Sequence, residues 1–204
     1  MTDEVLDNWL SSISYKSKQD LYENLYLKAI VDSYSRIDKT SGLENTIRDR
    51  FIRDLENYNP LTSTLIQNEI LVVDFEKWIN VKETEKRRID ISFTIQGLRG
   101  RFDIECKRLF QQESKNEAYI NDGLIRFTEL KYARNNQYAG MIGFVVSGHV
   151  PTILDHTISR TKAFQFAGEF SDAKCVNWDY SFISNHKRGD DSIIQVYHLL
   201  FEFI

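Results

Sequence analysis

The sequence of 204 residues lacks the features that would assign it to several special classes of protein. Its two cysteines, Cys106 and Cys175, form no CxxC pair and have no histidine spaced as a second ligand, so we expect neither a zinc site nor a disulfide framework. No apolar run approaches the roughly 18 residues of a membrane-spanning helix. The N-terminal Met-Thr-Asp-Glu-Val lacks the basic start and apolar core of a secretion signal. We therefore expect a cytoplasmic protein.

An excess of positive charge is also missing, because 26 Lys and Arg stand against 30 Asp and Glu, for a net charge of −4. This balance excludes a uniformly basic coat for nucleic acid but allows a local basic site. The basic residues gather in one segment: residues 86–134 contain 11 Lys and Arg against 7 Asp and Glu. With 42% hydrophobic and 13% aromatic residues, the chain has enough apolar side chains for a full core, so we expect a single domain over 1–204.

The periodicity of apolar residues predicts elements in the order ααα-βββ-α-β-α-ββ. Helical spacing predicts two helices within 3–35, and Ser41-Gly-Leu-Glu44 has the form of a capping box that begins a third helix, which ends near Pro60. The remaining segments are predicted as strands over 64–74, 88–96, 101–107, 139–147, 174–184 and 193–203, and as helices over 117–133 and 151–166. This order favours an α/β fold with a mixed central sheet and helices on its faces.

The clearest pattern is the strict alternation of polar and apolar residues over 88–96. The turn signal Gly97-Leu-Arg-Gly100 follows, and then a second alternating strand over 101–107. Together these segments predict a β-hairpin with one apolar and one polar face.

The register of this hairpin decides which polar side chains meet. If Gln96 and Arg101 close the turn, Asp90 lies opposite Lys107. A register shifted by two residues keeps the faces and puts Asp90 beside Glu105 instead. In either register Asp90, Glu105 and Lys107 converge on the polar face.

Two carboxylates and an ammonium group in one place suit a hard divalent cation. Mg²⁺ takes one or two protein carboxylates, keeps several waters and bridges to phosphate oxygens. Asp90 and Glu105 would supply the carboxylates, and Lys107 would orient a water or stabilise charge on a phosphodiester. The implied reaction is phosphodiester hydrolysis.

Asp90, fourteen intervening residues and then Glu105-Cys106-Lys107 resemble the PD-(D/E)xK nuclease superfamily, which has the restriction-endonuclease-like fold. The resemblance implies that Asp90 and Glu105 hold Mg²⁺ or Mn²⁺, that the backbone carbonyl of Cys106 adds a ligand, and that Lys107 assists the attacking water. The sequence departs from the motif at Ile89, which stands where the superfamily has Pro.

The resemblance also implies the extent of the fold. The superfamily core, α-β-β-β-α-β, matches residues 43–147, with an N-terminal helical elaboration over 1–40 and a C-terminal helix and strands over 148–204. Many members carry an acidic residue in the helix before the first strand that contacts metal through water, and Glu44 has that place. A capping box is an equally good explanation for Glu44.

The tripeptide (D/E)-x-K is common by itself. It also occurs at Glu113-Ser-Lys115, Glu129-Leu-Lys131 and Asp172-Ala-Lys174. Glu105 differs from these because it lies on an alternating strand and follows a strand whose same-side face carries an Asp. The alternative interpretation is a solvated hairpin face with ordinary ion pairs.

The predicted helix over 117–133 adds candidate substrate contacts. Tyr119, Asp122 and Arg126 fall at i, i+3 and i+7, and so on one face of an α-helix. The superfamily often uses this helix to present a basic side chain to the scissile phosphate or to the active-site acid. We expect Arg126 in that role, with Tyr119 and Lys131 as further contacts. A surface pair of Arg126 with Asp122 is the alternative.

Motifs of other enzymes, namely HExxH, GxSxG and GxxxxGK[ST], are absent from the sequence. We expect a metal-dependent endonuclease that acts on DNA more than RNA, in a bacterial or phage-defence context by association only. One site reaches one phosphodiester at a time, so we expect a homodimer or a subunit of a larger complex. Two alternatives stay open: a non-catalytic module that binds nucleic acid or a partner, and a metal-dependent phosphoesterase of a smaller substrate.

Overall fold

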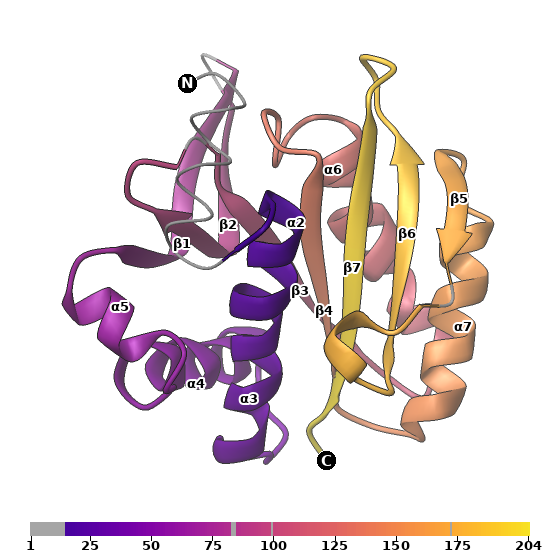
Figure 1. Ribbon diagram of the computed structural model, residues 1–204. Helices are drawn as coiled ribbons and strands as arrows, with labels where there is room; N and C mark the ends of the chain where they lie inside the picture. Colours follow the sequence, from indigo (N-terminus) through magenta and orange to yellow (C-terminus); the bar gives the residue numbers. More distant parts are fainter. Residues whose placement is uncertain (1–14, 83–84, 99, 172) are drawn as a thin grey trace.

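The computed structural model describes residues 15–82, 85–98, 100–171 and 173–204, and it places a seven-stranded mixed sheet between helices (Figure 1). The strand order is β1-β2-β3-β4-β7-β6-β5. The strands are β1 (Leu71–Lys82), β2 (Glu85–Ile95), β3 (Phe102–Leu109), β4 (Tyr138–Val145), β5 (Ala167–Ser171), β6 (Ser181–Lys187) and β7 (Ile193–Glu202). β4 pairs in parallel with β3 and β7, and the other neighbours are antiparallel. The predicted α/β class and mixed sheet are confirmed.

Helices precede the sheet and connect its strands. They are α2 (Lys18–Leu21), η1 (Tyr22–Leu27), α3 (Lys28–Arg36), α4 (Glu44–Asn57), α5 (Ser63–Gln67), η2 (Glu113–Asn116), η3 (Tyr119–Leu124), α6 (Ile125–Thr128), α7 (Val150–Lys162) and η4 (Cys175–Asn177). α2, η1 and α3 follow one another without a break, which agrees with the helical spacing predicted there. The earlier part of the prediction, over residues 3–14, lies outside the described residues.

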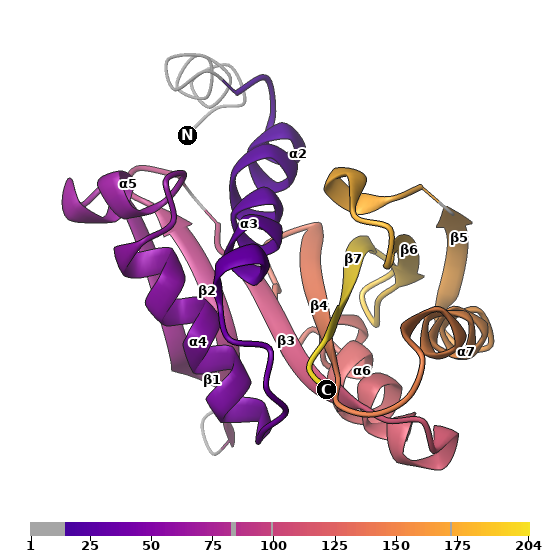
Figure 2. The ribbon, with the colours of Figure 1, turned by 90° about the horizontal axis from the view of Figure 1, so that it is seen from below.

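Two apolar layers hold the sheet, one on each face. The N-terminal helices α2 to α4 lie on one face and α6 and α7 on the other (Figure 2). On the first face, Tyr26 stacks on Phe93 of β2 with ring centroids 4.6 Å apart. On the second face, Leu124 and Phe127 pack in one buried cluster with Met141 of β4. The alternation along β2 and β3 therefore delivers apolar side chains to the first layer, as the sequence predicted, and polar ones to the opposite face.

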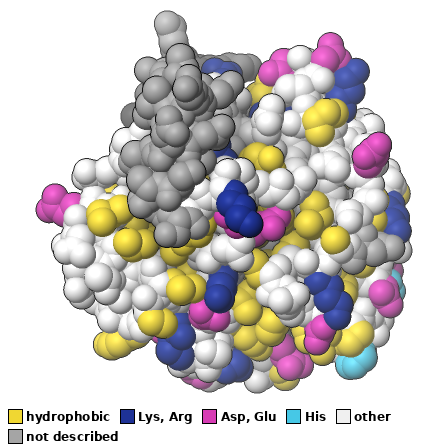
Figure 3. All heavy atoms as spheres, viewed as in Figure 1, with side chains coloured by type: hydrophobic (Ala, Val, Ile, Leu, Met, Phe, Trp, Pro, Cys, Tyr) yellow, Lys and Arg dark blue, Asp and Glu magenta, His cyan; other side chains and the backbone are white. Residues whose placement is uncertain are grey.

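None of the helices in the described ranges combines the length and the apolar character that crossing a membrane requires. Acidic and basic side chains are interspersed over the face shown in Figure 3. This distribution agrees with the exclusion of a uniformly basic surface.

The register of the β2–β3 hairpin is the second of the two considered. The pairs are Ile91 with Ile104, Ser92 with Asp103, and Phe93 with Phe102. The register with Asp90 opposite Lys107 is therefore wrong. The turn is wider than the sequence predicted because Gly97 (φ 83°) and Gly100 (φ 110°) both take left-handed conformations, and the chain turns over more residues than four.

Several element boundaries also differ from the prediction. Residues 64–74 begin as the helix α5 and become a strand only at Leu71, and β5 was not predicted. Residues 117–133 contain only η3 and α6, because the chain leaves the helix after Thr128 and Leu130 takes φ 57°. β6 begins at Ser181, later than the predicted strand over 174–184.

The capping-box interpretation of Ser41 and Glu44 is wrong. The residue that caps α4 is Leu43, which offers no side-chain hydrogen bond. The carboxylate of Glu44 instead accepts a hydrogen bond from the main-chain N–H of Arg108 on β3, at 3.1 Å. Glu44 thus ties the start of α4 to the hairpin.

Candidate active site

The site begins where β2 and β3 separate. Their pairing ends at Ile91 and Ile104, and Asp90, the residue before Ile91, is the first residue of β2 beyond the paired region. One carboxylate oxygen of Asp90 accepts a hydrogen bond of 2.8 Å from the main-chain N–H of Cys106. The Asp90 side chain thus replaces the next main-chain partner of β3, and the buried N–H of Cys106 stays hydrogen-bonded where the pairing with β2 ends.

The strand on the other side of Asp90 is distorted at the same level. In the β1–β2 register, Phe75 pairs with Ile91 and Lys77 with Ile89, so Glu76 stands opposite Asp90. Glu76 has φ 49°, a conformation that a non-glycine residue adopts only when its surroundings fix it. Ile89 packs with the second apolar layer although Ile91 packs with the first. A local distortion of the sheet therefore presents Asp90 from both sides.

Glu105 lies next to this gap with its side chain 1% exposed. Its Oε1 accepts hydrogen bonds from Lys107 Nζ at 2.5 Å and from Arg126 Nη1 at 2.6 Å. Its Oε2 is buried and has no hydrogen-bond partner within the described part of the chain. A buried carboxylate oxygen without a partner costs free energy, so Oε2 of Glu105 is a candidate ligand for an ion or a water.

Lys107 connects three of the predicted residues. Besides Glu105, its ammonium group donates to the main-chain carbonyl of Cys106 at 2.9 Å. Glu44 Oε1 lies 3.8 Å from the same nitrogen. The structure therefore brings Asp90, Glu105 and Lys107 together, and Glu44 and the Cys106 carbonyl lie beside Lys107.

Arg126, on α6, also reaches the site. Its Nη1 contacts Glu105 and donates a second hydrogen bond of 2.9 Å to the hydroxyl of Tyr132. That hydroxyl donates in turn to the main-chain carbonyl of Arg88, at 2.6 Å. Tyr132 therefore fixes Arg126 between the sheet and the loop after α6.

Arg48 approaches from the opposite side, on α4. Its side chain is 3% exposed and its guanidinium lies 3.4 Å from Asp90, 3.1 Å from Glu76 and 2.9 Å from Asp49. Arg48 is one helical turn beyond Glu44, so both side chains project from the same face of α4. A buried guanidinium surrounded by carboxylates holds Asp90 and the distorted part of β1 in place.

The surroundings of Glu105 and Lys107 raise the pKa of both groups. Burial, and next the charge of Asp90, raise the pKa of Glu105 to about 7 against the opposing effect of Lys107 and Arg126. Burial acts to lower the pKa of Lys107, but the charges of Glu105, Glu44 and Asp90 together raise it. These charges favour the protonated form of Lys107, in which its ammonium group donates to Glu105 and to the Cys106 carbonyl.

The donor set fits a divalent cation held by two carboxylates. Asp90 is 14% exposed, and among the residues that the structure describes none is hydrogen-bonded to Oε2 of Glu105. In the described residues no group of three or more His, Cys, Asp or Glu is arranged to hold a metal ion. Mg²⁺ does not need such a group, since it keeps several waters and takes one or two carboxylates.

Two predicted contacts lie away from this cluster. Tyr119 is 1% exposed, and its hydroxyl is hydrogen-bonded to Nδ1 of His198 inside the second apolar layer. The reason is that η3 is a π-helix, whose wider turn breaks the α-helical phase that would put Tyr119 on the face of Arg126. Lys131 pairs with Glu129 and makes no contact with the cluster that the structure shows.

Two residues of the cluster were missed in the sequence. Arg48 had a weak signal, its spacing of four from Glu44 on a predicted helix. Tyr132 had none, because the loop that carries it returns to the sheet only in the folded chain.

No protein-family model matches this chain, and no curated protein or solved structure gives a significant match to it.

Proposed function

We propose that the chain is a metal-dependent nuclease that hydrolyses phosphodiester bonds, most readily those of DNA. The observation that carries the proposal is the convergence of Asp90, Glu105 and Lys107 where β2 and β3 separate. A solvated hairpin face would leave these side chains exposed, whereas Glu105 is buried and the side chain of Lys107 is 12% exposed.

Asp90 and Glu105 would hold Mg²⁺ or Mn²⁺, with the carbonyl of Cys106 as a further ligand. When bound, such an ion lowers the pKa of a coordinated water and neutralises charge on the phosphate. Lys107 donates to Glu105 and to Cys106, so its ammonium is positioned beside both groups to orient the attacking water. Arg126 supplies a second cation for charge that develops on the phosphate oxygens. The water oxygen bonds to phosphorus as the P–O bond to the leaving oxygen breaks, the water gives up a proton to solvent, and the leaving oxygen takes a proton from solvent.

The order of elements supports a restriction-endonuclease-like core. Apart from the short helices α5 and η2, the elements α4, β1, β2, β3, the η3–α6 segment and β4 follow in the order α-β-β-β-α-β, with β3 and β4 parallel. The acidic Glu44 at the start of α4 reaches the same site. A single site of this kind cleaves one strand, so cutting a duplex requires a homodimer or a partner subunit.

The test is incubation of the purified protein with linear, supercoiled and single-stranded DNA and with RNA, in Mg²⁺, Mn²⁺ or EDTA. Cleavage that needs the metal and is lost in Asp90→Ala, Glu105→Ala and Lys107→Ala supports the proposal. Equal cleavage by wild type and all three variants contradicts it. Tight nucleic-acid binding without cleavage, unaffected by the three substitutions, favours a binding module instead. Cleavage of small phosphodiesters but no polymer favours a phosphoesterase.

A further inference from the structure

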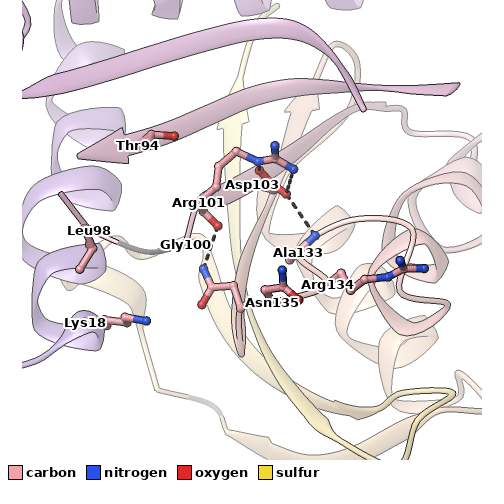
Figure 4. A pocket seen from close by; sticks show the side chains of 10 residues that line it. Lys18, Thr94, Leu98, Gly100, Arg101, Asp103, Ala133, Arg134 and Asn135 are labelled. Atoms are coloured by element: carbon pink, nitrogen blue, oxygen red, sulfur yellow. Dashed lines mark hydrogen bonds and ion pairs between the residues drawn. The ribbon is translucent and has the colours of Figure 1, made fainter. Parts of the chain in front are cut away.

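A pocket of about 770 Å³ opens at the turn end of the β2–β3 hairpin, away from the Asp90–Glu105–Lys107 cluster. Lys18 and Leu98 lie on one side of it, Arg134 and Asn135 on the other, and Arg101 between them (Figure 4). Pockets for small ligands have volumes of roughly 300–1,000 Å³, so this one accommodates a nucleotide-sized molecule.

The charged side chains of the pocket favour an anion. Three cations, Lys18, Arg101 and Arg134, stand against a single acid, Asp103. Arg101 pairs with Asp103 through Nε at 2.5 Å and Nη2 at 3.0 Å, so these two charges compensate each other and the net positive charge of the pocket comes from Lys18 and Arg134. Asp103 also accepts hydrogen bonds from Ser92 Oγ and from the main-chain N–H of Ala133, both at 3.1 Å.

Lys18 is brought to the pocket by the fold. Its Nζ lies 3.9 Å from the position a Cβ would take at Gly100, in the hairpin turn. Arg134 is exposed and lines the pocket from the loop that follows α6. Two cations from distant parts of the sequence thus flank one cavity.

The wall that carries Arg134 and Asn135 is fixed by buried groups. Ala133 has φ 48°, a strained conformation for a residue with a side chain. Arg188, which is 4% exposed, donates to the carbonyls of Ala133 at 3.0 Å and Asn136 at 2.9 Å. The side chain of Asn136 donates to the carbonyl of Arg101 at 2.9 Å, across the base of the pocket. Strained backbone that is held by buried hydrogen bonds is typical of preorganised binding sites.

The pocket lies on the same face of the hairpin as the active-site cluster. Arg101 directly precedes β3, and Asp103 and Glu105 lie on it. These three residues alternate with apolar ones, so all three share the polar face of the hairpin. The four residue-to-residue steps from Arg101 to Glu105 span about 13 Å of strand. The loop after α6 follows the same path, with Tyr132 contacting Arg126 of the cluster and Ala133 contacting Asp103.

We propose that this pocket binds the phosphate of a nucleotide between Lys18, Arg101 and Arg134. The phosphate has two possible sources. It is part of a nucleic-acid strand whose neighbouring phosphates lie at Asp90, Glu105 and Lys107, or it is part of a free mononucleotide. The strand source rests on the proposed nuclease function, whereas the phosphate site does not.

The test measures the affinity of a fluorescently labelled single strand of about ten nucleotides by anisotropy, in EDTA so that no cleavage occurs. Wild type is compared with Lys18→Ala/Arg134→Ala, with Glu105→Gln, and with Arg53→Ala as a control. Arg53 is an exposed arginine on α4 that does not line the pocket. Unlabelled AMP and inorganic phosphate serve as competitors.

The double variant is expected to bind about tenfold more weakly or worse, because each cation contributes a charge-assisted hydrogen bond to phosphate. Its slope of log affinity against log salt is expected to fall by about 0.7 for each phosphate that is no longer neutralised. A change in folding alone would not alter that slope in this way, and Arg53→Ala is expected to bind as wild type does. Displacement of the strand by AMP at comparable concentration assigns the site to a free nucleotide, and failure of AMP to displace it assigns the site to the strand.

No binding of either the labelled oligonucleotide or labelled AMP by wild type, or the same affinity and salt slope in wild type and the double variant, overturns the pocket proposal. Binding that depends on Lys18 and Arg134, in a protein that cleaves nothing with Mg²⁺ or Mn²⁺, contradicts only the nuclease function. Metal-dependent cleavage, together with binding that does not depend on Lys18 and Arg134, contradicts only the pocket proposal.

Discussion

The carboxylate of Asp90 accepts a hydrogen bond of 2.8 Å from the main-chain N–H of Cys106, at the end of the β2–β3 pairing. Through this hydrogen bond, the backbone of β3, the strand that carries Glu105 and Lys107, fixes the position of the Asp90 side chain. Arg48 holds the other carboxylate oxygen of Asp90 at 3.4 Å. The geometry of the site is therefore built into the sheet, and its stability can be tested separately from its chemistry.

Arg48→Ala is expected to lower the free energy of unfolding by about 2 kcal/mol, because it leaves Asp90 and Glu76 without their buried partner. The measurement is urea denaturation of both proteins. Arg53→Ala, an exposed position on the same helix, is the control and is expected to change stability by less than about 0.5 kcal/mol. Equal stabilities of Arg48→Ala and Arg53→Ala would show that Arg48 does not hold the site together.

Tyr132→Phe is expected to reduce the single-turnover cleavage rate several-fold with little change in affinity for nucleic acid. The substitution removes the hydroxyl that links Arg126 to the carbonyl of Arg88, so Arg126 loses its fixed position beside Glu105. Tyr132 acts through Arg126 and is a positioning residue. A loss of affinity with an unchanged rate would contradict this role.

Mn²⁺ is expected to raise the melting temperature of the wild type, because an ion that binds only the folded state stabilises it by mass action. Glu105→Gln and Asp90→Asn are expected to remove this shift. Glu113→Gln is the matched control, since Glu113 begins another (D/E)xK tripeptide but pairs with Arg160 on the surface. The same shift in all four proteins would place the ion elsewhere.

His186 is expected to make the free energy of unfolding decrease as the pH decreases below neutrality. Burial lowers its pKa to about 4, whereas the unfolded chain has a pKa near 6.5. The unfolded state therefore binds more protons between these values, and stability falls as the pH decreases from about 6.5 towards 4. At pH 5 the loss from His186 is about 2 kcal/mol.

His186→Gln is expected to reduce this loss when urea denaturation is compared at pH 7 and pH 5. Each protein is referred to its own value at pH 7, which removes the direct cost of the substitution. Glu105 titrates in both proteins and cancels in the comparison. Burial, and next the charge of His186, lower the pKa of His198, so in His186→Gln His198 keeps the larger effect of burial and loses only the smaller one. An identical pH dependence in the two proteins would contradict the assignment to His186.

The alternation of β2 and β3 was sufficient to predict the hairpin and the convergence of Asp90, Glu105 and Lys107, because side-chain direction in a strand depends only on local geometry. The register was not predictable, since it depends on a turn with two left-handed glycines and on the separation of the strands at Asp90.

The other errors have similar causes. Tyr119 was placed by α-helical spacing, which fails across a π-helical turn. Glu44 fits a capping box in sequence, and only the packing of α4 against β3 gives its carboxylate a different partner. Arg48 and Tyr132 contact the site from elements distant in sequence, which periodicity cannot reveal.

The most direct test of the account is the rate of DNA cleavage in Mg²⁺ by wild type, Glu105→Gln and the control Glu113→Gln. Glu105→Gln keeps the size of the side chain but removes the charge that two cations and a metal ion share, so the account predicts a loss of at least about a hundredfold. Glu113→Gln is predicted to cleave at the wild-type rate. Equal rates for all three proteins would contradict the account.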